Sequence, residues 1–435
     1  MVSHVIPAVA DQSTVREFEE RIFRAPDARL VWHEPTSYAT PLDRSNLLHA
    51  IITWGRLTQS STLVVGEAVS SAADLTRFME CDELLLAGIS ARQVRRFNDA
   101  QITPDARSSA SHELARRRAI PSEGTHRTLV LNNTEPSWNT SPDAMAGAPP
   151  SVSTDAGARS LFFRVSLEGT STDERSMLLG AGETVVTDEF TRDWLVRARW
   201  PEAHPLGGSG PFTTLGQRIL NPTRPMIDAW ERGHPRGSSP ADWLGQALWE
   251  IFQNTEHHAS STGGTRIDRA TRMLLCTRWS KTELMSAPET MSRYVDGVER
   301  ASGTKVDGYL MVTVLDSGDG LAYTAAARDD VGFLDESDEI AYLKSAVRGT
   351  SQSPERPMHG FGMPIVSQLL TDLGGLLRIR SGSLSLSRDF AARPRSANER
   401  DDPLDWHFDL DDSARPFRRF GSAVTVVLPS YGDAE

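Results

Sequence analysis

The chain contains few cysteines and no long hydrophobic run. Cys81 and Cys276 are the only two cysteines among 435 residues, too few for a disulfide framework or for a zinc site built from cysteines alone. No apolar stretch approaches the roughly 18 residues that cross a bilayer, and the N-terminus lacks the basic and apolar regions of a signal peptide. We therefore expect a protein of the reducing cytoplasm that is not embedded in a membrane.

Positive charge is also scarce. The formal net charge is −12, and only three of the 46 basic residues are lysines, at positions 281, 305 and 344. A negative net charge does not indicate nucleic-acid binding, although it leaves room for a local basic patch. The composition is otherwise that of a globular protein, with 39% hydrophobic and 24% charged residues.

The length is sufficient for two or three domains with full cores. Residues 1–135 alternate strand-like runs such as ARLVWHE and STLVVGEA with helix-like runs such as NLLHAIITWGRL, and RTLVLNN ends the region as a strand. This alternation predicts a separate N-terminal α/β domain, whose role the sequence does not indicate. Residues 136–212 are rich in Pro, Ser, Ala and Gly and predict a linker and connecting segment, which leaves 213–435 as a second domain.

A helix is expected over the stretch ALWEIFQNTEHHA, residues 247–259. Its apolar positions follow helical spacing and form one stripe, which consists of Leu244, Ala247, Leu248, Ile251 and Thr255. Glu250, Asn254 and His257 form a second stripe, which carries a carboxylate, a carboxamide and an imidazole but no cation. This second stripe is either an ordinary solvated face or the wall of a polar pocket.

Two glycine-rich turns follow this helix in the sequence. An apolar run over residues 308–315 is typical of a buried strand, and it ends in Asp316, Gly318 and Gly320, a turn that lets backbone approach a ligand closely. The second turn, Gly360-x-Gly362, opens a further helix, where free backbone N–H groups favour a phosphate.

The segment between these turns, residues 321–359, shows no strong periodicity, and we interpret it as a long lid loop. After the second turn and its helix come two strand-like runs, LLRIRSG at 376–382 and GSAVTVVLP at 421–429. These runs complete the second domain as a mixture of helices and strands.

The order of these motifs resembles the GHKL superfamily, which includes the ATP-binding domains of gyrase B, MutL and histidine kinases. EIFQNTEHHA resembles its N box, DSGDG and HGFGMPIV its two glycine boxes, and GSAVTVVLP its closing strand. The resemblance covers roughly residues 215–435. It implies a Bergerat-type α/β sandwich, in which a mixed sheet carries helices on one face.

The resemblance also implies roles for single residues. Asn254 would hold Mg²⁺ through its side-chain oxygen, and Asp316 would accept a hydrogen bond from the adenine amino group. Backbone at four glycines would pack on the base and phosphates of ATP, with Ser422 of the closing strand beside it; these glycines are Gly318, Gly320, Gly360 and Gly362.

The predicted lid adds further candidates. Arg348 and His359 are candidates for contact with the γ-phosphate, and Lys344 is the only lysine of the lid. All three are equally compatible with a solvated loop.

Two features depart from the family pattern. Residues 383–420 form a charged, proline-containing insertion where the family has a short hairpin, and we interpret it as a disordered loop or a partner-binding element. The N-terminal half resembles no known GHKL partner domain. Proteins of this build often act as switches in bacterial stress or phage defence, with a protein partner or as a homodimer, and the resemblance carries that expectation over to this chain.

Four functions remain open. Glu250 occupies the place of the residue that activates water in the hydrolysing branch of the family, which favours a slow Mg-dependent ATPase. A histidine-kinase-like activity would need a phosphoacceptor, for which SASHELARRR offers His112. The third possibility is an ATP sensor without turnover, and the fourth is a small-molecule or nucleic-acid enzyme in the N-terminal domain, regulated by the ATP-binding domain.

Overall fold

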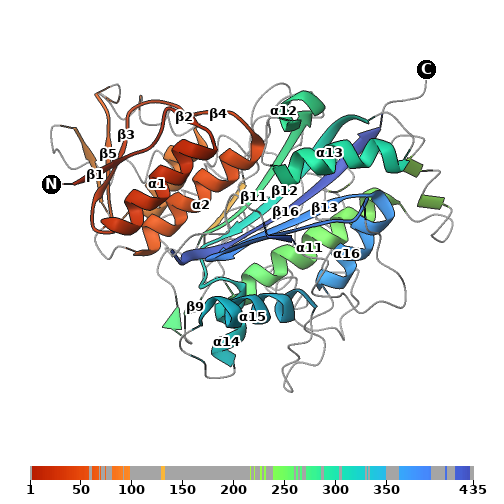
Figure 1. The fold of residues 1–435 in the computed structure, drawn as a ribbon. Coiled ribbons are helices and arrows are strands. Elements are labelled where there is room, and N and C mark those ends of the chain that lie inside the picture. The colour runs from red at the N-terminus through yellow and green to blue at the C-terminus, as the bar shows by residue number, and fades with distance from the viewer. Residues whose placement is uncertain are drawn as a thin grey trace, which may run out of the picture.

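The computed structural model of the protein shows an α/β fold (Figure 1). In chain order, it describes residues 2–97 with short gaps, 129–132, isolated positions between 216 and 239, 240–348 with short gaps, 362–392, 407–408 and 417–431. Among these described residues, no helix is both long and apolar enough to cross a membrane.

The N-terminal region is built on a parallel sheet of four strands in the order β1-β3-β5-β6. Their bounds are Ser3–Val5, Arg29–Trp32, Thr62–Val65 and Gln93–Arg96. The helices described between these strands are α1 (Gln12–Arg24), α2 (Pro41–Leu57) and α4 (Asp82–Ser90). The short strands β2 (Val9–Ala10) and β4 (Ser37–Tyr38) pair with each other. The expected strands ARLVWHE and STLVVGEA are therefore confirmed as β3 and β5, and the expected helix NLLHAIITWGRL as α2.

Helix α1 illustrates how local sequence fixes these elements. Asp11 is its N-cap, and its side chain accepts a 2.8 Å hydrogen bond from the Thr14 N–H, which satisfies one of the free donors of the first turn. Val15, Phe18 and Ile22 recur at helical spacing and are buried.

The second sheet has seven strands in the order β15-β14-β13-β16-β12-β11-β7. In that order the bounds are His407–Phe408, Leu384–Asp389, Leu376–Gly382, Arg419–Tyr431, Val306–Asp316, Thr271–Ser280 and Leu129–Asn132. Every pairing between the described strands of this sheet is antiparallel, whereas the resemblance implied a mixed sheet. A separate two-stranded ribbon joins β9 (Ser261–Thr262) to β10 (Thr265–Arg266).

Helices cover both faces of the seven-stranded sheet, not one face as expected (Figure 1). On one face lie α11 (Pro240–His258) and α16 (Gly362–Leu373), which pack side by side. On the other lie α2 and α13 (Glu289–Ser302), with the short α12 (Lys281–Met285) beside α13. Both faces are covered because β12 and β16 carry apolar residues on both of their sides. Met311 and Val427 pack on the side of α13, and the residues next to them in each strand pack on the opposite side.

The N-terminal elements pack directly on the seven-stranded sheet. Side chains of α2 reach both sheets: the Trp54 ring N–H donates to the Ala28 carbonyl just before β3, and His49 donates to the Phe420 carbonyl in β16. Strand β7, expected to end the N-terminal domain, pairs with β11 at the edge of the seven-stranded sheet. One hydrophobic core runs through both regions, and the proposed domain limits remain a prediction.

Two further expectations are corrected by the fold. The predicted lid loop contains two helices, α14 (Leu321–Arg328) and α15 (Glu336–Arg348), because short apolar faces including Ala322 and Leu343 find core to bury against. The predicted insertion begins as a strand. The chain turns at Gly382, and β14 pairs antiparallel with β13, from Leu384 opposite Ser381 to Asp389 opposite Leu376.

Candidate functional site

The loop after β12 holds the Asp316 side chain in a fixed position. Asp316 is 6% exposed, and its Oδ1 accepts a 2.8 Å hydrogen bond from the Gly318 N–H. Gly320 follows with a φ of +93°, a left-handed conformation that favours glycine. Its carbonyl accepts the first hydrogen bond of α14, from Thr324. The loop is therefore a tight connection between a buried strand and a helix.

The start of β16 locks this loop from the side. The Gly421 N–H donates a 2.6 Å hydrogen bond to the Gly318 carbonyl, and Gly421 has a φ of +82°. A Cβ at Gly421 would collide with the Asp316 carbonyl oxygen. A glycine at position 421 is thus needed for this close backbone approach.

Two buried serines close the other side of the loop. The Ser381 hydroxyl at the end of β13 accepts a 2.8 Å hydrogen bond from the Leu321 N–H, and the Ser422 hydroxyl lies 3.5 Å from it. The structure therefore brings together Asp316, Gly318, Gly320 and Ser422, as the motif order suggested. Ser381 was missed by sequence reasoning. It is the next-to-last residue of β13, and a serine at the end of a predicted strand is the signal that could have pointed to it.

Helix α11 has the two faces expected from its sequence. The apolar stripe from Leu244 to Thr255 is buried. Glu250 and Asn254 are partly buried, and the Gln246 side-chain N–H donates a 3.1 Å hydrogen bond to the Glu250 carboxylate. Burial raises the pKa of Glu250, and the hydrogen bond from Gln246 opposes that rise only in part. His257 belongs to the same helix, but its side chain is outside the described residues.

Other predicted site residues are placed only in part. Gly362 is the first residue of α16, as expected, whereas His359 and Gly360 lie outside the described residues. Arg348 ends α15 and its side chain is not described, while Lys344 is partly buried on the same helix. The kinase candidate His112 lies outside the described residues.

Helix α15 is fixed to the turn between β13 and β14. Glu339 is buried, and its carboxylate accepts hydrogen bonds from the Ser383 N–H at 2.8 Å and from the Ser383 hydroxyl at 2.5 Å. Gly382 in that turn has a φ of +59°, and a Cβ there would collide with the Glu339 carboxylate. In this structure α15 is therefore attached to the sheet through Glu339.

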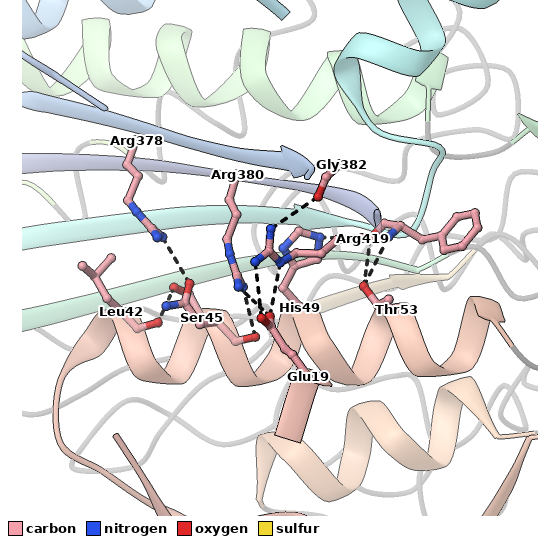
Figure 2. A network of polar contacts seen from close by, with 11 residues as sticks. Glu19, Leu42, Ser45, His49, Thr53, Arg378, Arg380, Gly382 and Arg419 are labelled. Atoms are coloured by element: carbon pink, nitrogen blue, oxygen red, sulfur yellow. Dashed lines mark hydrogen bonds and ion pairs between the residues drawn. The ribbon is translucent and has the colours of Figure 1, made fainter. Parts of the chain in front are cut away.

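A buried ionic network joins the N-terminal helices to the sheet, and Figure 2 shows its members. Arg380 on β13 donates to Glu19 on α1 at 2.5 Å, and Arg419 on β16 donates to the same carboxylate at 3.3 Å. Arg419 also donates to the Gly382 carbonyl. His49 beside them has a pKa well below its usual range, because it is fully buried and faces the two guanidinium groups. It is therefore neutral and donates to the Phe420 carbonyl.

A second polar cluster lies at the loop itself and was also missed by sequence reasoning. An Arg56 guanidinium N–H lies 3.5 Å from the Asp319 carboxylate, and the Arg418 guanidinium is 3.9 Å from the same oxygen. Arg418 also stacks 3.5 Å from the centroid of the Tyr323 ring in α14. Asp319 occupies an unspecified position of the Asp-x-Gly-x-Gly pattern, so the pattern gave no sign of this contact.

No cluster of three or more His, Cys, Asp or Glu side chains within the described residues is placed to bind a metal ion. Comparisons of the chain with protein-family models, with curated proteins and with solved structures gave no match. The fold and site define an α/β protein with a glycine-lined loop at the end of a central strand.

Proposed function

We propose that the protein binds ATP at the Asp316–Gly320 loop and is a slow Mg-dependent ATPase of the GHKL type that acts as a conformational switch. The observation that carries this proposal is the joining of two sequence motifs. The Gly421 N–H of the closing strand is bonded to the Gly318 carbonyl of the first glycine box, which places Asp316 and Ser422 at one point of the sheet.

The residues present are compatible with such a ligand. Gly320 and Gly421 both have positive φ, and added Cβ atoms would meet Ser381 and the Asp316 carbonyl, so these two glycines let the chain fold tightly around Asp316. The buried Asp316 carboxylate is an acceptor that would pair with the adenine amino group and not with the guanine carbonyl.

The remaining roles follow from the residues of α11 and α16. The N-terminus of α16 at Gly362, with Gly360 before it, would receive phosphate oxygens with the help of the helix dipole. Asn254 would supply an oxygen ligand to Mg²⁺, which would neutralise phosphate charge. Arg348, His359 and Lys344 remain candidates for phosphate contact from the former lid.

Glu250 is the proposed base for hydrolysis. It lies one helical turn before Asn254, so both side chains leave the same side of α11. Its raised pKa brings the carboxylate closer to the operating pH, which favours proton acceptance from water. A switch of this kind fits a protein partner or a second copy of the chain.

Isothermal titration calorimetry with Mg-ATP and Mg-GTP tests the site assignment. We expect Asp316→Asn to lose its preference for adenine, because an amide presents donors as well as an acceptor, and Asn254→Ala to bind Mg-ATP more weakly. Asp372→Asn near the C-terminal end of α16, where the side chain is partly exposed, is the control, and its affinity should equal that of the parent. Unchanged affinity and selectivity in both site variants would place the nucleotide elsewhere.

A further inference from the structure

Three segments of the chain meet at Asp319 inside the proposed nucleotide loop. Arg56 comes from the last turn of α2, and Arg418 directly precedes β16. Both guanidinium groups lie within 4 Å of the Asp319 carboxylate, and Arg418 also donates to the Asp319 backbone carbonyl at 3.4 Å. The Asp319 side chain is 14% exposed, so water screens these contacts less than on an open surface.

The same helix also holds the first residues of β16. His49 donates to the Phe420 carbonyl at 2.9 Å, and the Thr53 hydroxyl accepts from the Phe420 N–H at 3.3 Å. The Arg56 guanidinium lies over the Phe420 ring, 5.2 Å from its centroid. The next residue, Gly421, is bonded to the Gly318 carbonyl. Helix α2 therefore contacts the loop twice, through Asp319 and through the Phe420–Gly421 backbone.

We propose that Arg56 and Asp319 are positioning residues, through which α2 holds the Asp316–Gly320 loop in its nucleotide-binding conformation and senses whether the site is occupied. This inference rests on the proposed ATP site and adds the path by which it communicates with the N-terminal unit. Neither residue needs to touch ATP, since each acts on the loop that does.

The physical reason is the cost of ordering the loop. A loop held by Arg56 before binding has less conformational freedom to lose when the ligand arrives, which increases affinity. Because coupling between two sites is reciprocal, a bound nucleotide must in turn stabilise the contact with α2. Arg56 could also have a simpler role, because a cation in the last turn of any helix interacts favourably with the helix dipole and so stabilises the helix.

A matched pair of variants separates these two roles. Arg24 stands in the last turn of α1 and pairs with Glu20 at 3.3 Å, but it is far more exposed and belongs to a helix that does not carry the Asp319 contact. We expect Arg56→Met to weaken Mg-ATP binding about five-fold in calorimetry of the full chain, and Arg24→Met to leave it unchanged. Arg56→Lys keeps a cation near Asp319 and should recover part of the loss.

The double variant Arg56→Met with Asp319→Asn tests whether the two residues act together. If they do, its loss of affinity should be smaller than the sum of the two single losses, because either single change already breaks the contact between Arg56 and Asp319. Additive losses would show that the residues act separately and would overturn the proposed pairing. Unfolding curves of each variant check that the binding measurement is made on folded protein.

Hydrogen exchange of the unmodified chain supplies a test that requires no variant. Saturation with a non-hydrolysable Mg-ATP analogue should slow exchange several-fold at the C-terminal end of α2, and leave α1 unchanged. Nucleotide binding without any change in α2, together with parent-like affinity of Arg56→Met, would overturn the coupling while the proposed function stands. Absence of nucleotide binding by the parent chain would overturn both.

Discussion

Arg380 on β13 and Glu19 on α1 form a buried ion pair across 361 positions of sequence, with 2.5 Å between Nη2 and Oε1. Each side chain is at most 2% exposed, and Arg419 on β16 shares the same carboxylate. Because both arginines contact the Glu19 carboxylate, the packing of the N-terminal helices on the sheet depends strongly on this one residue.

Replacing this carboxylate should destabilise the protein strongly. In Glu19→Gln two buried guanidinium groups lose their opposite charge, and we expect the free energy of unfolding to fall by about 3–5 kcal/mol. Urea denaturation of the full chain measures this. Glu17→Gln on the exposed side of α1 is the control and should stay within about 0.5 kcal/mol of the parent. A loss as small as that of the control would mean that the network contributes little net stability.

The buried His49 should make stability depend on pH. Its pKa is depressed in the folded state, so below the unfolded pKa of about 6.5 the unfolded chain binds the proton more readily and stability falls. The slope approaches about 1.4 kcal/mol per pH unit between this pKa and the folded one. Asp43 and Glu250 act in the opposite direction at lower pH, because burial raises their pKa.

The variant His49→Gln isolates that contribution, since an amide donates to the Phe420 carbonyl but does not titrate. As the pH falls from about 7.5 to about 5.5, we expect the free energy of unfolding of the parent to decrease relative to that of the variant. A difference that stays constant over this range would exclude His49 as the titrating group.

The backbone contact at Gly421 should tolerate no side chain. In Gly421→Ala the new Cβ meets the Asp316 carbonyl and the residue must keep a positive φ, so we expect a loss of about 2–4 kcal/mol. Gly297→Ala in α13 is the matched comparison, because its nearest neighbour would be 3.8 Å away in a helix. That change should stabilise the protein by about 0.5–1 kcal/mol. Thermal unfolding of the two variants gives both signs in one experiment.

Removal of the proposed base should separate turnover from binding. We expect Glu250→Gln to lower the rate of phosphate release about 10²–10⁴-fold while Mg-ATP affinity stays close to that of the parent. Asp242→Asn at the other end of α11 is the control and should turn over like the parent. Because burial raises the pKa of Glu250, the parent rate should decline on the acid side at a higher pH than an ordinary glutamate would give. Equal turnover in Glu250→Gln and parent would contradict the assignment.

The local pattern of the sequence predicted several elements well. Apolar residues from Leu244 to Thr255 recur with helical spacing, and the structure buries them on α11. The run before Asp316 is apolar on both sides, and it forms the buried strand β12. The loop conformation predicted for residues 321–359 was wrong at 321–328 and 336–348, because α14 and α15 are short helices whose periodicity is weak and whose stability comes from packing.

What the sequence by itself determined is therefore the identity of strands and helices whose own residues carry the pattern, together with the glycine-rich turn that contains Gly320. Only the tertiary structure decided that α2 and α13 cover the second face of the sheet, and that Arg56 and Arg418 meet Asp319. The sequence does not mark such pairs, because 263 positions separate Arg56 from Asp319 and an arginine has the same local pattern whether it is solvated or paired. Burial and opposite charge select the partner only when the chain has folded and water is excluded from the space between them.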